Sequence, residues 1–207
     1  MPGLSTHINF ARLVLERTAV SLDRVHYILG CVAPDCINLR DGQVFAQSHF
    51  LSANKVPDLN TFLHTANLTI NIITSPNDSF LYGYFSHLWL DRYIQEHGHT
   101  LQVVNNLEMS ETEKSVAFKI NIRRYDLGYI KELISKDTIG FDPDISLFHF
   151  LSGDLILKRL SDVLDFADIS NDNSPTIISE EHYINFLIDA ADIFLTQASL
   201  WGQANIT

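Results

Sequence analysis

The sequence predicts an all-α protein: a single-domain bundle of about seven helices with one long ordered loop. Apolar residues recur with the helical period of about 3.6 along the whole chain, whereas strict alternation over the length of a strand is scarce. The chain has 207 residues, of which 46% are hydrophobic and 19% are charged. That composition is sufficient for one substantial core, so we expect residues 1–207 to form one domain.

Capping residues mark the first two expected helices. Ser5 or Thr6 can accept hydrogen bonds from the amides of a first helix that runs to about Ala19. Asp23 can cap a second helix, which we expect to stop near Gly30 because glycine commonly ends helices.

Residues 30–57 form the expected long loop. Gly, Pro, Asn and Asp interrupt the helical pattern there, and the segment contains Asp35 and His49. Loops of this length without secondary structure are usually functional or disordered. The aromatic residues Phe45 and Phe50 within the segment favour a packed loop.

Turn and capping signals divide the rest of the chain into further helices. Pro76-Asn77-Asp78 breaks one helical pattern and starts the next, and Ser110-Glu111-Thr112-Glu113 has the form of a capping box. Residues 170–175 read as a polar linker before the last helix, which Ser179 can cap. The expected helices cover 58–73, 76–98, 110–136, 142–166 and 179–201.

Charge and composition exclude several classes of partner. The formal net charge of −11 argues against an electrostatic grip on nucleic acid or anionic lipid, because both require clustered Lys and Arg. Residues 1–7 lack the features of a secretory signal, and no stretch approaches the roughly 20 apolar residues of a membrane span. We therefore expect a cytoplasmic protein, and we interpret Cys31 and Cys36 as buried thiols.

The most informative pair of residues is His87 and Asp91, in the segment GYFSHLWLDR. Residues four apart lie on one face of a helix, so this imidazole and this carboxylate can bind one metal ion or share a proton. The surrounding residues are apolar, and an unpaired carboxylate would be costly there. The placement favours a metal site over a solvated ion pair.

Three residues upstream can complete such a site. Pro34 restricts the backbone next to Asp35 and aims its carboxylate in a fixed direction, which suits a ligand or a general base. An Asx turn or a helix cap is the alternative role for Asp35. His7 and His49 also stand in apolar settings, and imidazole is the commonest metal ligand, although both can be buried structural histidines.

Other candidates for chemistry are weaker. The sequence has no nucleophile elbow, no P-loop, no dinucleotide fingerprint and no His-Glu-x-x-His motif. His26, His64 and His182 have no acidic residue four positions away toward the candidate site, and we interpret them as structural or surface residues.

Taken in order, the motifs resemble the zinc-dependent phospholipase C family, which is all-α and shares its zinc-site plan with fungal single-strand-specific zinc nucleases. The resemblance rests on Thr6-His7, Gly30-Cys31-Val32-Ala33-Pro34-Asp35, Ser48-His49-Phe50 and the helix from Gly83 to Asp91. It covers roughly the N-terminal half and weakens beyond about His99.

The resemblance implies a set of metal ligands. One zinc ion would be held by Asp35, His49, His87 and Asp91, and a second beside it by His7 with Asp91 as a bridge. In the family an N-terminal Trp completes the second site. This chain has no such Trp, and the Pro2 imine, five residues before His7, is the alternative ligand.

A further zinc of the family uses a His after the His-x-x-x-Asp motif, where His97 falls, and a later His-x-x-x-Glu or His-x-x-x-Asp. His149 is the candidate for the later histidine. Gly153 stands four residues after it, and Asp154 lies one position beyond the ideal helical spacing. One to three ions are therefore compatible with the sequence.

The implied function is a metal-dependent hydrolase of phosphate esters, similar to phospholipase C and acting through metal-activated water. Asp35 would be both a ligand and the candidate base. The substrate would be a phospholipid headgroup ester or a soluble phosphodiester. Zinc fits the ligands, as would iron or manganese. The alternatives are an inactive helical metal-binding or scaffold protein of the same fold, and a protein whose His and Asp residues are only structural.

Overall fold

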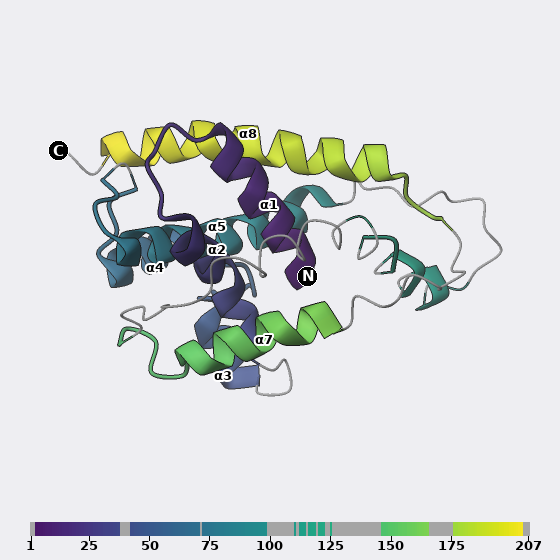
Figure 1. Ribbon diagram of the computed structural model, residues 1–207, viewed down its shortest axis with the longest axis horizontal. Helices are drawn as coiled ribbons and strands as arrows, with labels where there is room; N and C mark the ends of the chain where they lie inside the picture. Colours follow the sequence, from purple (N-terminus) through teal and green to yellow (C-terminus); the bar gives the residue numbers. More distant parts are fainter. Residues whose placement is uncertain are drawn as a thin grey trace.

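A computed structural model of the chain describes residues 3–37, 42–70, 72–98, 110, 112–114, 116–118, 120–122, 125, 146–165 and 176–204. The principal elements are α1 (Leu4–Arg17), α2 (Arg24–Val32), η1 (Ala33–Cys36), α3 (Gly42–Ser48), α4 (Leu59–Ala66), α5 (Pro76–His97), α7 (Gly153–Asp165) and α8 (Glu180–Ala204) (Figure 1). Within these ranges the only extended pairing is one isolated bridge between Leu51 and Pro57. The fold is all-α, as predicted.

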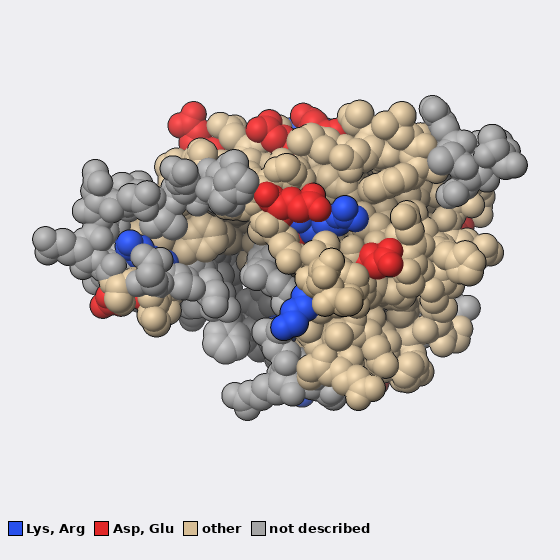
Figure 2. Space-filling view, turned by 180° about the vertical axis from the view of Figure 1, so that it is seen from behind, with Lys and Arg blue, Asp and Glu red and all other residues tan. Residues whose placement is uncertain are grey.

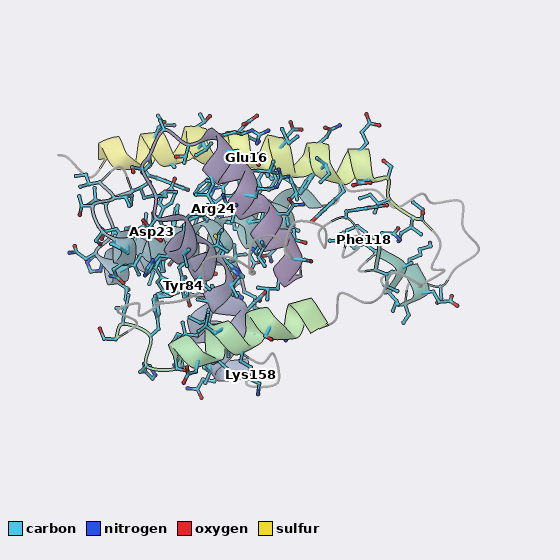
Figure 3. All side chains as sticks on the ribbon, viewed as in Figure 1. Glu16, Asp23, Arg24, Tyr84, Phe118 and Lys158 are labelled. Carbon is cyan, nitrogen blue, oxygen red and sulfur yellow. The ribbon has the colours of Figure 1, made fainter. Side chains whose placement is uncertain are left out.

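The helices lie in layers around α5. Helix α8 runs along one long edge of the molecule, α7 lies along the opposite edge, and α1, α2 and α5 lie between them (Figure 1). Helix α5 packs against α2, and α1 packs against both α2 and α8. Charged side chains such as Glu16 and Lys158 point outward, whereas Tyr84 of α5 lies in the interior (Figure 3).

Helix α5 begins with a complete capping box. The Ser75 hydroxyl accepts a hydrogen bond from the Asp78 amide at 3.0 Å, and the Asp78 carboxylate accepts one from the Ser75 amide at 2.9 Å. Pro76 follows the cap, where its missing N–H costs nothing. Every residue from Ser79 to Asp91 is buried. The sequence placed the start of this helix correctly.

Two glycines let α2 and α5 approach closely. A Cβ atom added at Gly30 would lie within 3.0 Å of the Phe80 carbonyl, and one added at Gly83 would meet the Tyr27 carbonyl within the same distance. Real Cβ atoms essentially never come so close to a backbone. Gly30 therefore does not stop α2, as the sequence suggested, because it is needed inside the crossing and the helix continues to Val32.

Of the N-caps predicted for the first two helices, the structure confirms only the second. Helix α1 has Gly3 as its N-cap, and Ser5 and Thr6 lie buried inside the helix, so the expected caps were wrong. The Thr6 hydroxyl is instead engaged across the core by the Tyr183 hydroxyl at 3.1 Å. Asp23 caps α2 as predicted and accepts a hydrogen bond from the His26 amide at 3.0 Å.

The described part of segment 30–57 is ordered but contains helical structure. It includes the end of α2, the η1 turn and α3, none of which we expected there. Helix α3 has only seven residues, too few for a periodic apolar pattern to stand out. Helix α4 ends before its expected limit because Asn67 adopts a left-handed conformation with φ of 49°.

For the later helices, the predicted N-caps are confirmed more often than the predicted end residues. Glu113 and Ser110 form the predicted capping box, and the Ser179 hydroxyl accepts from the His182 amide at 3.1 Å. Residues 146–152 are not helical, so the helix expected from 142 is wrong over that stretch. Helix α7 starts at Gly153 because the Ser152 hydroxyl caps it through the Leu155 amide at 3.1 Å. Residues 142–145, the end of the helix after Ser110 and the linker 170–175 lie outside the described residues.

The surface reflects the acidic composition. Acidic side chains follow the edge formed by α8 when the molecule is viewed from behind (Figure 2). On that helix the exposed acidic residues include Glu180, Glu181, Asp189 and Asp192. None of the helices that the structure describes combines the length and the hydropathy needed to cross a membrane.

Candidate metal centre

Five of the predicted site residues converge in the interior. His7 comes from α1, Asp35 from η1, His49 from the residue after α3, and His87 and Asp91 from successive turns of α5. They form two groups that could hold a metal ion: His7, His87 and Asp91, and Asp35, His49 and His87. Within each group the candidate ligand atoms lie within 4.8 Å of one another. The two groups share His87.

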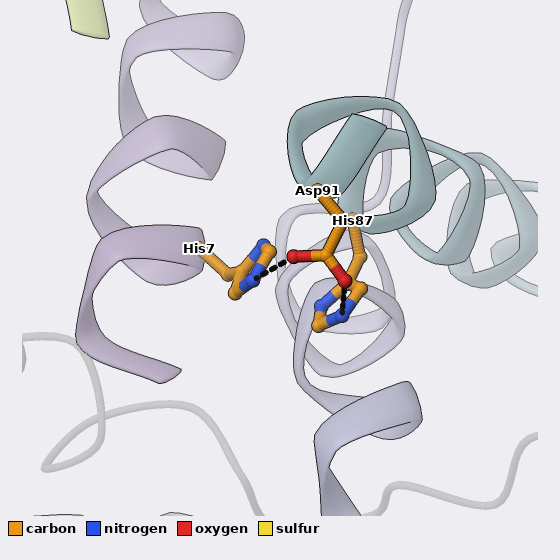
Figure 4. Close-up of side chains that lie close together, drawn as sticks. All are labelled: His7, His87 and Asp91. Atoms are coloured by element: carbon orange, nitrogen blue, oxygen red, sulfur yellow. Dashed lines mark ion pairs between the residues drawn. The ribbon is translucent and has the colours of Figure 1, made fainter. Parts of the chain in front are cut away.

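The Asp91 carboxylate lies between three imidazoles. Its Oδ1 atom is 3.4 Å from Nε2 of His7, and its Oδ2 atom is 3.5 Å from Nε2 of His87 (Figure 4). The same Oδ2 atom is 3.7 Å from Nε2 of His49. One carboxylate therefore faces both groups, as a bridging ligand would.

Helix geometry and the glycine crossing position His87. The spacing of four residues puts His87 and Asp91 on the same face of α5. The close approach of α2 brings the Cys31 carbonyl oxygen to 2.8 Å from Nδ1 of His87. A carbonyl can only accept a hydrogen bond, so Nδ1 carries the proton and Nε2 presents a lone pair to the site.

His49 is oriented in the same way by its own surroundings. Its Nδ1 atom is 3.1 Å from the Phe45 carbonyl oxygen and 2.9 Å from the Ser48 hydroxyl. The carbonyl again assigns the proton to Nδ1. Consequently Nε2 of His49 faces Nε2 of His87 at 3.4 Å and Oδ1 of Asp35 at 3.5 Å. Nitrogen lone pairs and carboxylate oxygens gathered in this way repel one another unless a cation lies among them.

His7 supplies a second indication of a cation. Its ring is stacked on that of His87, with centroids 3.6 Å apart and planes inclined by 12°. Neither ring nitrogen of His7 has a hydrogen-bond partner among the described residues, and the same holds for Oδ1 of Asp91. Buried polar atoms without a partner are costly and call for an explanation. The donor set of imidazole and carboxylate matches that of zinc.

The electrostatics keep His7, Asp35 and Asp91 in their ligand forms. Burial, reinforced by His87, lowers the pKa of His7, so this imidazole is neutral at neutral pH. Burial alone would raise the pKa values of Asp91 and Asp35, but the neighbouring histidines lower both below the usual range. Metal ligands of these types bind as neutral imidazole and ionised carboxylate.

His97, His149 and Asp154 belong to neither group. His97 lies in the last turn of α5, where its ring contacts that of Tyr93 at 4.6 Å between centroids. His149 stands in the turn before α7, and Asp154 in the first turn of that helix. All three are exposed, in contrast to the five residues above. Their assignment to a further metal site stays a prediction.

Sequence reasoning missed the residues that orient the candidate ligands. Two of these groups are backbone carbonyls, those of Cys31 and Phe45. The others are the Ser48 hydroxyl and the glycines of the α2–α5 crossing, which act through contacts between segments. Backbone carbonyls leave no sequence signal. Ser48 could have been suspected only because it directly precedes His49.

Comparison with known families identifies the family of the chain. The family model described as zinc dependent phospholipase C matches residues 6–186, which is most of the chain. The chain belongs to the zinc-dependent phospholipase C family. The match confirms the resemblance seen in the N-terminal motifs and extends it to residue 186 in α8. No curated protein and no solved structure matches the chain significantly.

Proposed function

We propose that this member of the zinc-dependent phospholipase C family is a metal-dependent hydrolase of phosphate esters. The observation that carries the proposal is the buried convergence of three imidazoles and two carboxylates, with His7 and Asp91 retaining atoms that have no hydrogen-bond partner. In this chain Asp35, His49, His87 and Asp91 would hold one zinc ion. His7 and Asp91 would contribute to a second, adjacent ion.

Zinc held by these residues would lower the pKa of coordinated water toward neutrality and would neutralise charge on phosphoryl oxygens. The protein residues supply the remaining functions. The Asp91 carboxylate lies within 3.5 Å of two histidines, and the crossing with α2 fixes His87 through the Cys31 carbonyl. The surrounding buried helices exclude bulk water, which strengthens the interaction with an anionic phosphate.

Asp35 is the candidate general base. Its side chain is 18% exposed, compared with 4% for Asp91, so Asp35 is the carboxylate that a substrate can reach. Burial opposes ionisation, but the contact with His49 lowers the pKa of Asp35, and the ionised form can accept a proton at neutral pH.

The proposed substrate is a phosphodiester, with a phospholipid headgroup ester as the choice that family membership favours. The family name supports a phospholipid, whereas the acidic side chains along α8 would not attract an anionic bilayer. A short-chain phosphatidylcholine and a soluble aryl phosphodiester therefore both belong in the first assay.

A second candidate is a helical metal-binding protein of the same fold without catalytic activity. The observation in its favour is that His97, His149 and Asp154 are exposed and belong to neither candidate group, so the family's full set of ions is not assembled by the described residues. Such a protein would bind zinc without turning over either ester.

The test combines metal analysis with turnover. Purified protein should contain zinc by elemental analysis, hydrolyse at least one of the two esters, lose activity with a chelator and regain it with zinc. Asp35→Asn should bind zinc more weakly because one anionic ligand is lost, and it should lack turnover even at saturating zinc if Asp35 is the base. Zinc without turnover would support the second candidate, and protein that binds no zinc and has no activity would refute both.

A further inference from the structure

We propose that Ser48 is a positioning residue that fixes the ring of His49 for metal binding. The inference rests on the proposed function in that it takes His49 as a ligand. It adds a residue that would touch neither metal nor substrate and would act through a neighbouring imidazole.

The Ser48 hydroxyl lies at the meeting point of three segments. It is completely buried and lies 2.9 Å from Nδ1 of His49, 2.9 Å from the Phe45 carbonyl oxygen and 3.4 Å from the Pro34 carbonyl oxygen. Pro34 directly precedes Asp35 in η1. The hydroxyl group therefore lies between the α3 terminus, which carries His49, and the turn that carries Asp35, and its single proton can serve only one of the two carbonyls at a time.

The proton arrangement at Ser48 follows from its partners. Both carbonyl oxygens can only accept, so the hydroxyl donates its single proton to Phe45, at the shorter distance. The hydroxyl oxygen is then left with lone pairs that accept the Nδ1 proton of His49 at 2.9 Å, and this proton also lies within reach of the Phe45 carbonyl oxygen at 3.1 Å. This arrangement holds the Nδ1–H tautomer and directs Nε2 toward Asp35 and His87, as metal binding requires.

The backbone around Ser48 is held as firmly as its hydroxyl. The Tyr84 hydroxyl, one turn before His87 on α5, donates to the Ser48 carbonyl oxygen at 2.5 Å. After His49 the chain closes α3 with Phe50 in the left-handed region at φ of 48°. The Phe50 amide bonds to Gln47 and the Leu51 amide to Ala46, which is the pattern of a Schellman cap.

Left-handed backbone is unfavourable for a residue other than glycine. The Phe50 ring offsets this cost by packing edge-on against Phe62 and Tyr84, with centroids 5.2 and 6.4 Å away. Tyr84 thus contacts both sides of His49: the carbonyl of the residue before it and the ring of the residue after it. The position of His49 relative to α5 is determined by these contacts.

Ser86 provides a matched control. It is also completely buried and also directly precedes a candidate ligand, His87. Its hydroxyl, however, donates to the Tyr82 carbonyl at 2.8 Å and accepts from the Tyr27 hydroxyl at 3.0 Å, and neither partner is a ligand. Both serines lose a buried hydrogen bond when changed to alanine, but only Ser48 loses a bond to an imidazole.

The experiment measures zinc affinity and the state of the His49 ring. Zinc dissociation constants of wild type, Ser48→Ala, Tyr84→Phe and Ser86→Ala are determined by competition with a chelator. Loss of a group that orients a metal-bound imidazole typically costs 10- to 100-fold in affinity, and we expect this for Ser48→Ala. Tyr84→Phe should cost about 2- to 10-fold, and Ser86→Ala less than about threefold.

Nuclear magnetic resonance of protein labelled with ¹⁵N in its histidines gives an independent readout, with and without zinc. In Ser48→Ala the Nδ1 proton of His49 should exchange faster with water, while that of His87 stays protected. Equal losses of zinc affinity in Ser48→Ala and Ser86→Ala, with an unchanged His49 signal, would overturn the positioning role. If wild type binds no zinc, the metal proposal fails, and the His49 signal of the metal-free protein still tests Ser48.

Discussion

The five converging residues and the three remaining candidates were proposed from the same kind of motif, yet they occupy opposite environments. His7, Asp35, His49, His87 and Asp91 come from four elements that meet around α5, and all but Asp35 are almost fully buried. His97, His149 and Asp154 are exposed at the end of α5, in a turn and at the start of α7. Residue type and spacing do not distinguish the two sets. They differ in that only the first set is packed around a shared helix, α5.

Replacement of Asp91 is the strongest test of whether the buried set binds metal. Asp91→Asn keeps the shape of the side chain but removes the charge that would allow two zinc ions to lie close together, so we expect the loss of at least one bound ion. Elemental analysis at saturating zinc compares the variant with wild type. Unchanged stoichiometry would remove Asp91 from direct contact with metal.

A second test compares His87, from the buried set, with the two exposed histidines. His87→Ala removes a residue that belongs to both groups, and its zinc affinity should fall by more than the 10- to 100-fold typical of residues that only orient a ligand. His149→Ala and His97→Ala should stay close to wild type if the exposed residues are not ligands. A loss in His149→Ala as large as that in His87→Ala would mean that the histidines are sorted wrongly.

The α2–α5 crossing offers a test of how the buried set is assembled. Gly83→Ala forces a Cβ against the Tyr27 carbonyl, and overpacking of a rigid backbone contact should destabilise the protein by about 3 kcal/mol. Gly42→Ala is the control, because a Cβ there meets nothing within 4 Å. Urea unfolding of the metal-free proteins measures both. Similar stability of the two variants would argue against the close crossing.

The smallest effect concerns pH. Burial alone would lower the pKa of His87, but the Asp91 carboxylate more than offsets this and raises it above the usual value of about 6.5. Zinc must displace the proton of His87 below that raised pKa. Affinity should therefore fall as pH decreases from 8 toward 6, by up to about tenfold per unit for each displaced proton.

The lowered pKa of His7 adds no proton to displace in this range. Competition titrations at several pH values measure the slope, and His149→Ala should reproduce the slope of wild type. An affinity that does not change with pH would show that His87 binds zinc without releasing a proton.

The parts of this structure that the sequence predicts are those determined by nearby residues. Asp23, Ser179 and the Ser110–Glu113 pair act on amides three residues away, and their caps were predicted correctly. The facing of His87 and Asp91 follows from helical spacing alone. Gly30 was misread because its role depends on Phe80 of a distant helix, which no local pattern reveals.

The same distinction holds in the candidate site. Its members could be named from motifs, but their mutual distances depend on how α1, η1 and the α3 terminus pack on α5. The short helix α3 was not predictable from the sequence. The left-handed conformation of Phe50 was not predictable either, because it is stabilised by the tertiary packing of the Phe50 ring. Asn67, by contrast, is a residue type that accepts this conformation readily.

The sharing of His87 between the two groups has a consequence for how zinc would be acquired. With Nδ1 committed to Cys31, His87 has one lone pair and can bind only one ion. A zinc ion bound by Asp35 and His49 would also take the lone pair of His87. A second, adjacent zinc ion would then have only His7 and one oxygen of Asp91 as ligands from these groups, which is fewer than the four ligands that zinc prefers. The two positions would then fill in sequence, and occupancy of the weaker one would rise and fall with the zinc supply around the protein.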